Sequence, residues 1–279
     1  MGNELEYSVL DAIKKMTGED NNSTKGSLFD NESLENEKGI NKNSTDIEIL
    51  DYMIVFICER LKSVKKVFKG GYVLMKVMPE LARYSHDIDF SIDNDKQYEL
   101  VKGVLSELGE TLIKKEIILS YTIKENITPT SSGGIKCDRG QFKENIGIDI
   151  GYHNLSYGIK EWNIFGFNES SFVYERMLSD KLSVVYSPKR FRRAKDLYDV
   201  YIISTSCDVD TKEISKMLVK RGIDWTKTPF NETVMVEYRK AYDKLKVVNQ
   251  LGTEINKPDF DMCISVLKDL VIKVRSHYA

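Results

Sequence analysis

The sequence contains few cysteines, and their spacing does not suit a metal centre. None of the four cysteines belongs to a C-x-x-C pair, and structural zinc sites need closely spaced ligands. Cys58 and Cys263 fall within apolar helical patterns, where a buried thiol is the expected state. We therefore expect these cysteines to be packing residues and not zinc ligands.

Long hydrophobic runs are also missing. The longest apolar segments are far shorter than the roughly 20 residues that a membrane-spanning helix needs. Residues 1–8 contain acidic side chains and no apolar core segment, unlike a secretory signal peptide. These features predict a cytoplasmic protein without a membrane partner.

An excess of charge of either sign is absent as well, because the formal net charge is only −2. Overall charge therefore neither predicts nor excludes a nucleic-acid partner, and contact with RNA would need a local basic patch. The densest basic stretch contains Lys189, Arg190, Arg192, Arg193 and Lys195. It is a candidate contact for an RNA backbone, or else an ordinary solvated surface.

Two common catalytic motifs are missing. Gly70 and Gly71 are not followed by Gly-Lys-Ser/Thr at the spacing of a phosphate-binding P-loop. The chain has only three histidines, and no serine or cysteine nucleophile can be assigned to His153 from the sequence. A hydrolase triad is therefore unsupported.

Hydrophobic periodicity predicts strands in the first part of the chain and helices in the second. Thr45 and Glu48 have capping-box spacing at the start of the clearest helix. We expect helices over residues 5–16, 45–61, 72–77, 98–112, 173–185, 194–204, 211–221, 233–247 and 259–274. We expect strands over residues 87–93, 116–124, 143–150 and 162–167, and a turn over residues 131–134.

This order of elements predicts an α+β fold, in which a mixed β-sheet domain is flanked by helices and followed by a helical C-terminal part. Residues 17–44 are polar and contain too few apolar residues to fold alone. We therefore expect residues 1–44 to form an N-terminal helix and a polar, mobile segment. Residues 45–170 would form the sheet domain, and residues 171–279 the helical domain.

An Asp-x-Asp pair lies in the strand predicted over residues 87–93. Residues i and i+2 of a strand point to the same face, so Asp87 and Asp89 lie side by side. Their mutual repulsion favours a bound cation. Asp149, flanked by Ile148 and Ile150 in another apolar strand, is a third candidate ligand. The alternative is that each carboxylate simply faces solvent.

A glycine pair, Gly70-Gly71, precedes the short predicted helix over residues 72–77. Glycine lets backbone N–H groups approach a ligand closely, and a helix N-terminus favours phosphate. The pair is therefore a candidate phosphate contact, although a simple turn would also explain it.

Four blocks together resemble the AbiEii/AbiGii-type toxin nucleotidyltransferases, which belong to the wider polymerase-β-like superfamily. They read K-G-G-Y-V-L (69–74), R-Y-S-H-D-I-D-F-S (83–91), E-R-M-L-S-D-K-L (175–182) and R-A-K-D-L-Y-D (193–199). The family patterns are roughly K-G-G-T-A-L, R-F-S-E-D-I-D-F, E-x-x-x-A-x-K-L and R-x-x-D-L-x-D. Tyr72 departs from the usual small residue, and His86 from the usual acid.

The resemblance implies a role for each matching residue. The implied catalytic residues are Asp87, Asp89, Lys181 and Asp196, with Asp199 as a further possibility. The implied nucleotide-binding residues are Gly70, Gly71, Arg83, Ser85 and Lys181. The metal ligands would be Asp87, Asp89 and Asp149, holding Mg²⁺ or Mn²⁺.

Each role has a simpler alternative. Lys181 lies on an amphipathic helix, where a lysine is usually exposed to solvent. If Lys181 is a phosphate ligand, its loss would instead weaken the use of NTP more than it perturbs folding. Arg83 would pair with phosphate or with a surface acid. Asp196 and Asp199 lie three residues apart on one helix face. They would either position Lys181 and the substrates or pair with nearby basic residues.

Family resemblance also implies a function. The protein would transfer a nucleotide from an NTP to an acceptor, such as the 3′ end of tRNA, and release pyrophosphate. It would act as a toxin in an abortive-infection or toxin–antitoxin system, a form of phage defence, with a cognate antitoxin as partner. The alternatives are a nucleotide-binding regulatory module without transfer, or nucleotidylation of a protein or a small molecule.

Overall fold

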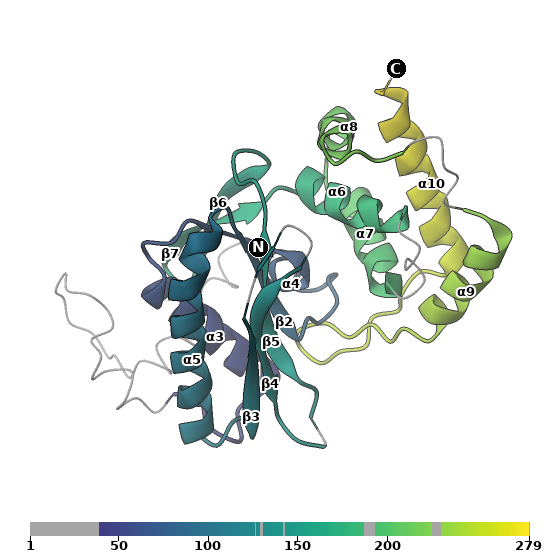
Figure 1. Ribbon diagram of the computed structural model, residues 1–279. Coiled ribbons are helices and arrows are strands. Elements are labelled where there is room, and N and C mark those ends of the chain that lie inside the picture. The colour runs from purple at the N-terminus through teal and green to yellow at the C-terminus, as the bar shows by residue number, and fades with distance from the viewer. Residues whose placement is uncertain are drawn as a thin grey trace. The chain divides into compact units, whose positions relative to one another are not determined.

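The computed structural model describes residues 39–125, 127–128, 131–141, 143–186, 193–224 and 230–278. The helix expected over residues 5–16 and most of the polar segment, residues 17–38, lie outside this part of the chain. Element labels follow Figure 1.

Described helices occur in both halves of the chain, and the last five follow one another without a described strand between them. They are α3 (Asp46–Arg60), α4 (Gly70–Val77), α5 (Tyr98–Lys114), α6 (Tyr174–Val185), α7 (Ala194–Ser206), α8 (Thr211–Lys220), α9 (Glu232–Asp243) and α10 (Phe260–Ser276). A single 3₁₀ turn, η1 (Asp95–Gln97), precedes α5. Each of these helices overlaps one that the hydrophobic periodicity predicts.

The described strands lie between α3 and α6. They are β1 (Lys66–Lys69), β2 (Asp87–Ile92), β3 (Ser120–Lys124), β4 (Gly133–Asp138), β5 (Ile146–Tyr152), β6 (Ile159–Ile164) and β7 (Phe167–Phe172). They form one sheet in the order β3-β4-β5-β2-β1-β7-β6. Strand β2 runs parallel to β5, whereas β4 runs antiparallel to β3 and β5. The sheet is therefore mixed, and the α+β prediction is confirmed.

The start of α3 illustrates how local sequence sets an element. The backbone N–H of Thr45 donates to Glu48 Oε2 (2.7 Å), and that of Glu48 donates to Thr45 Oγ1 (3.3 Å). This reciprocal capping box satisfies two N–H groups that the first helical turn leaves unpaired, and it confirms the predicted helix start.

Two expectations about strands were wrong. The segment 162–167 is not one strand, because Phe165 and Gly166 have φ angles of 51° and 79° and separate β6 from β7. Residues 131–134 are not only a turn, because Gly133 and Gly134 begin β4. A Cβ on Gly134 would lie 1.9 Å from the carbonyl oxygen of Ile148. This glycine is therefore required by the closeness of the β5 backbone.

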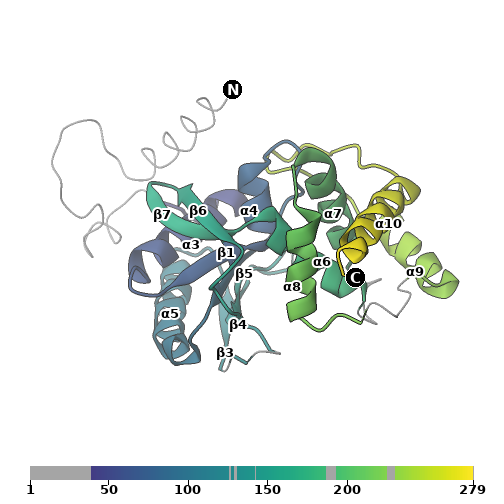
Figure 2. The same cartoon turned by 90° about the horizontal axis from the view of Figure 1, so that it is seen from above.

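Helices α3 and α5 pack against each other and cover one face of the sheet, with α3 against β2 and α5 against β3 and β4 (Figures 1 and 2). Tyr121 of β3 identifies this face, because its hydroxyl lies 3.2 Å from Ser106 Oγ on α5. Ile88 and Phe90 share the face through the strand register and are fully buried. Asp87 and Asp89 therefore point to the opposite face.

The chain divides into two compact units. The first contains at least part of every strand and consists of Met1–Val67, His86–Asn154 and Glu161–Ser170, within the described residues. The second consists of Phe68–Ser85, Leu155–Lys160 and Ser171–Ala279.

In the second unit, α7 and α10 pack together, α6 packs against α7 and α8, and α9 packs against α7 and α10 (Figure 2). Tyr238, Tyr242 and Phe260 form an aromatic cluster in its core. Among the described helices of the chain, none is long and apolar enough to cross a membrane.

Candidate active site

Three carboxylates lie on the sheet face opposite α3 and α5. In the register of β2 and β5, Asp89 is paired with Asp149 and Asp87 with Gly147. Paired residues of neighbouring parallel strands project to the same side, with strands about 4.8 Å apart. The side chain of Asp149 is 53% exposed. The first unit therefore presents a solvent-accessible row of carboxylates.

These carboxylates fit the coordination chemistry of Mg²⁺, which prefers oxygen ligands. A Cβ at Gly147 would come within 3.3 Å of Asp87 Oδ1, so the glycine leaves space beside that carboxylate. Within the described residues, however, no three acidic, histidine or cysteine side chains already converge as a metal cluster. The carboxylates share a face without meeting at one point.

His86, immediately before the row, points away from it. Its Nε2 lies 2.8 Å from Glu144, and its Nδ1 lies 4.0 Å from Asp46 in the first turn of α3. This placement agrees with the alternation of a strand, which turns consecutive side chains to opposite faces.

His153 has a serine neighbour that the sequence did not reveal. Its Nδ1 lies 3.0 Å from Ser91 Oγ, which corrects the expectation that no serine accompanies this histidine. Ser91 and His153 are 62 residues apart in the chain, and they meet because β2 and β5 end side by side. Ser91 is fully buried, so it is not an accessible nucleophile, and the pair gives no support for a hydrolase.

The glycine pair lies in the second unit and opens α4 directly. Gly70 has a φ of 77°, a conformation that glycine adopts without strain. A Cβ on Gly71 would lie 2.8 Å from Ser85 Oγ and 3.2 Å from Arg83 Nη2. Glycine at position 71 therefore lets the segment that carries Arg83 and Ser85 approach the first turn of the helix.

Lys181 is buried in an ion-pair network within the second unit. Its Nζ donates to Asp196 Oδ1 (3.0 Å) and to Asp199 Oδ2 (2.7 Å). Arg83 donates to Asp199 (3.0 Å), and Arg193 donates to Asp196 (2.7 Å). The side chains of Lys181, Asp196 and Asp199 are 10%, 7% and 3% exposed.

The protonation states in this network follow from burial and pairing. Burial alone would raise the pKa of Asp196, but the adjacent Lys181 and Arg193 lower it to about 2. Burial likewise opposes ionisation of Asp199, and Arg83 with Lys181 holds its pKa below the usual value. For Lys181, burial is outweighed by Asp199 and Asp196, which raise its pKa. All three groups are therefore charged at neutral pH.

The network changes the interpretation of several residues. Lys181 is buried and not exposed, and Arg83 pairs with the buried Asp199. Asp199, which the sequence placed at the site only as a possibility, bridges the two cations. Its spacing from Asp196 was the signal that could have revealed this role.

Only part of the basic stretch that contains Lys189 to Lys195 lies within the described residues. Lys189, Arg190 and Arg192 lie outside the described residues. Arg193 pairs with Asp196, and Lys195 is exposed on α7.

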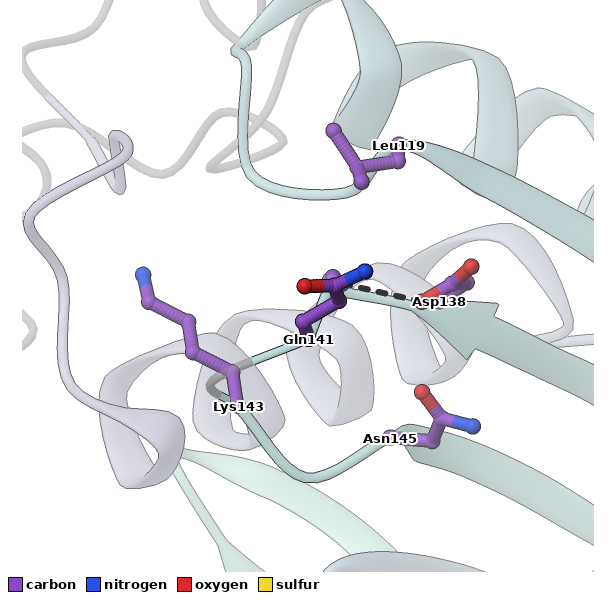
Figure 3. A pocket seen from close by; sticks show the side chains of 6 residues that line it. Leu119, Asp138, Gln141, Lys143 and Asn145 are labelled. Carbon is purple, nitrogen blue, oxygen red and sulfur yellow. Dashed lines mark hydrogen bonds between the residues drawn. The ribbon is translucent and has the colours of Figure 1, made fainter.

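A separate surface hollow of about 690 Å³ lies where β4 leads into β5 (Figure 3). It is lined by Leu119, Asp138, Gly140, Gln141, Lys143 and Asn145. The N–H of Gly140 donates to Asp138 Oδ1 (2.9 Å) across the turn. None of the candidate catalytic residues lines this hollow.

The mixed sheet, the Asp-x-Asp strand beside a third aspartate, and the glycine pair that opens a helix agree with the nucleotidyltransferase class expected from the sequence. A match to a known protein family identifies the enzyme class and the family within it. Residues 59–261 match the family described as "Nucleotidyl transferase AbiEii toxin, Type IV TA system". The chain therefore belongs to the AbiEii family of nucleotidyltransferase toxins from type IV toxin–antitoxin systems.

Several solved structures are similar at low sequence identity. MenT4, a nucleotidyltransferase toxin from Mycobacterium tuberculosis, is 16% identical, with 82% of this chain and 84% of that chain covered and a TM-score of 0.48. JHP933 from Helicobacter pylori is 16% identical, with 84% and 93% covered and a TM-score of 0.45. The Megavirus polyadenylate synthase is 23% identical, with 51% and 28% covered and a TM-score of 0.34. No curated protein matches. The family assignment rests on the family match alone.

Proposed function

We propose that this enzyme is a divalent-cation-dependent nucleotidyltransferase that moves a nucleotide from an NTP to an RNA acceptor, such as the 3′ end of tRNA. The observation that carries the proposal is the row of three carboxylates in register on β2 and β5. Carboxylate oxygens placed side by side in this way are the ligands that divalent cations such as Mg²⁺ prefer.

Asp87, Asp89 and Asp149 are the proposed ligands of Mg²⁺ or Mn²⁺. When bound, these ions would activate the attacking hydroxyl and stabilise the charge of the departing pyrophosphate. The acceptor oxygen forms a bond to the α-phosphorus, the bond from that phosphorus to the pyrophosphate oxygen breaks, and the hydroxyl proton is released.

Residues of the second unit are the proposed nucleotide contacts. Gly70, Gly71 and Ser85 would donate hydrogen bonds to the triphosphate, and Arg83 and Lys181 would supply positive charge. The short Lys181–Asp196 and Lys181–Asp199 contacts fix the direction of the ammonium group. In this arrangement Asp196 acts by holding Lys181 in place.

Modification of tRNA would block translation, which suits a toxin, and a type IV system implies a cognate antitoxin as partner. We place the enzyme in the cytoplasm, where its NTP and RNA substrates are found, and assign it to abortive infection as a phage defence.

Incubation with each labelled NTP, Mg²⁺ and total cellular RNA, followed by gel separation, tests the proposal. Label should enter RNA with one preferred NTP and should be absent when EDTA is present or when Asp89→Ala replaces the wild type. If the label enters a protein or a small molecule and not RNA, that molecule is the acceptor in place of RNA. NTP binding without any transfer would instead indicate a regulatory module.

A further inference from the structure

The carboxylate row continues sideways onto β3 and β4, where it meets two lysines. Backbone pairing places four residues at each of two successive levels of the sheet, all projecting to the same face. One level reads Lys124, Gly134, Asp149, Asp89, and the next reads Thr122, Lys136, Gly147, Asp87. Each level therefore contains one lysine and at least one proposed metal ligand.

A glycine separates the lysine from the carboxylate at each level. With no side chain at Gly134, the side chain of Lys124 crosses β4 and places its Nζ 3.7 Å from Asp149 Oδ1. Gly147 has no side chain, and the Asp87 carboxylate lies over it, with Oδ1 3.3 Å from the position that a Cβ would take. The basic and acidic residues of the face therefore lie one strand apart, with no other side chain between them at either level.

Both lysines are available to an anionic ligand. The side chain of Lys124 is 57% exposed, and its Nζ also donates to Ser132 Oγ (3.1 Å). Lys136 is exposed and forms no ion pair with any acidic side chain of the described residues. The nearest acid on the same face of β4, Asp138, already accepts a hydrogen bond from the Gly140 N–H.

We propose that Lys124 and Lys136 bind the backbone phosphates of the acceptor RNA next to its reacting 3′ end. The proposal rests on the function proposed above and adds the surface that holds the acceptor.

The openness of this face favours a polymer over a second small molecule. Strand β3 is the edge of the sheet, and Ser120 and Thr122 lie exposed beside Lys124. Small molecules usually occupy enclosed, largely apolar pockets, whereas phosphate backbones are held by exposed lysine, serine and threonine side chains. The surface therefore suits a strand that lies across β3 and β4 with its end at the carboxylates.

The Lys124–Asp149 ion pair should also affect the affinity for a divalent cation, which can be measured without catalysis. Lys124 repels a cation bound at Asp149, so its neutralisation should strengthen metal binding. For partly exposed charges the effect is small, about twofold in the Mn²⁺ dissociation constant.

The test compares tRNA affinity at several salt concentrations for the wild type and the Lys124→Gln/Lys136→Gln variant, with Mg²⁺ present. Each lost phosphate contact lowers the slope of log affinity against log salt by about 0.7–0.9, so a decrease of about 1.4–1.8 is expected. The control variant, Lys62→Gln/Lys114→Gln, removes the same charge from the turn after α3 and from the end of α5. These helices cover the opposite face, so the control should keep the wild-type slope. Thermal unfolding verifies that both variants are folded.

Two further measurements separate the possible failures. NTP affinity measured without a divalent cation should be unchanged in the Lys124→Gln/Lys136→Gln variant, and Lys124→Gln alone should bind Mn²⁺ about twofold more tightly. If the wild type binds tRNA and the variant keeps its slope, the lysine surface is overturned while the RNA acceptor remains. If the wild type binds no tRNA but labels a protein or a small molecule, both the surface and the RNA acceptor are overturned, and the transferase chemistry stands.

Discussion

Lys181 is buried beside two carboxylates, and this burial determines the effect of removing it. The sequence suggested an exposed lysine whose loss would leave folding largely intact. We now expect Lys181→Met to destabilise the protein by about 3–5 kcal/mol, because it leaves two buried aspartates without their shared cation. Denaturant unfolding measures this loss. The exposed Lys195→Met on α7 is the control and should change stability little.

A double variant distinguishes the electrostatic cause of this destabilisation from a simple loss of packing. Asp199→Asn combined with Lys181→Met should recover part of the lost stability, because one of the two stranded charges is removed. Equal destabilisation of the single and the double variant would argue against the electrostatic account.

Replacing Asp89 should affect activity and not stability, the opposite of what we expect for Lys181. It lies beside Asp149 in the register of β2 and β5, so Asp89→Asn removes one of two neighbouring negative charges. We expect nucleotide transfer to fall below detection, while the free energy of unfolding without metal stays the same or rises slightly. Activity assays and denaturant unfolding on the same preparation measure both effects. A fully active variant would remove the central role of this residue.

At the scale of elements, the network that joins α6 and α7 predicts a specific pH dependence. The pKa of Asp196 is lowered to about 2, below its value in the unfolded chain. Its contribution to stability is therefore complete above about pH 4 and is lost as the pH falls towards 2. At pH 7, the wild type should exceed Asp196→Asn in stability by about 2 kcal/mol, and the difference should shrink below pH 4.

Unfolding measured at intervals from pH 7 to pH 2 tests this dependence. A difference between the two proteins that stays constant over this range would mean that Asp196 is not held ionised by Lys181 and Arg193.

The start of α4 makes a second prediction at this scale. In Gly71→Ala, the new methyl group would lie 2.8 Å from Ser85 Oγ, so the segment that carries Ser85 must move. Overpacking of this kind costs about 1–3 kcal/mol. Removing the hydroxyl in the double variant Gly71→Ala/Ser85→Ala should recover part of the loss. Thermal unfolding of the single and double variants measures both steps, and an unchanged melting temperature in Gly71→Ala would contradict the packing argument.

At the scale of the whole molecule, membership of the toxin family predicts an effect on growing cells. Expression of the wild type should slow a bacterial host, and Asp89→Ala should restore growth because it removes a proposed metal ligand. Growth curves at matched protein levels measure the difference. If both proteins slow growth equally, toxicity does not arise from nucleotide transfer.

Much of the fold follows from local sequence. The helices α3 and α5–α10 carry strong apolar periodicity, and Thr45 with Glu48 marks the start of α3. Strand β2 is equally clear because polar and apolar residues alternate through it. The short β1, with four residues, and the glycine-rich start of β4 have no such local pattern. Pairing with neighbouring strands holds them in place, and the local sequence does not reveal that pairing.

The same division applies to the candidate site. The sequence by itself determined the Asp-x-Asp strand and the glycine pair, because each depends on residues close together in the chain. It also determined the family, because the family motifs are recognised by their residues, order and spacing along the chain. Only the tertiary structure decided that Asp149 lies beside Asp89, that Lys181 is buried between Asp196 and Asp199, and that Lys124 reaches Asp149. Strand register and helix packing bring these groups together from distant segments, and local periodicity carries no information about either.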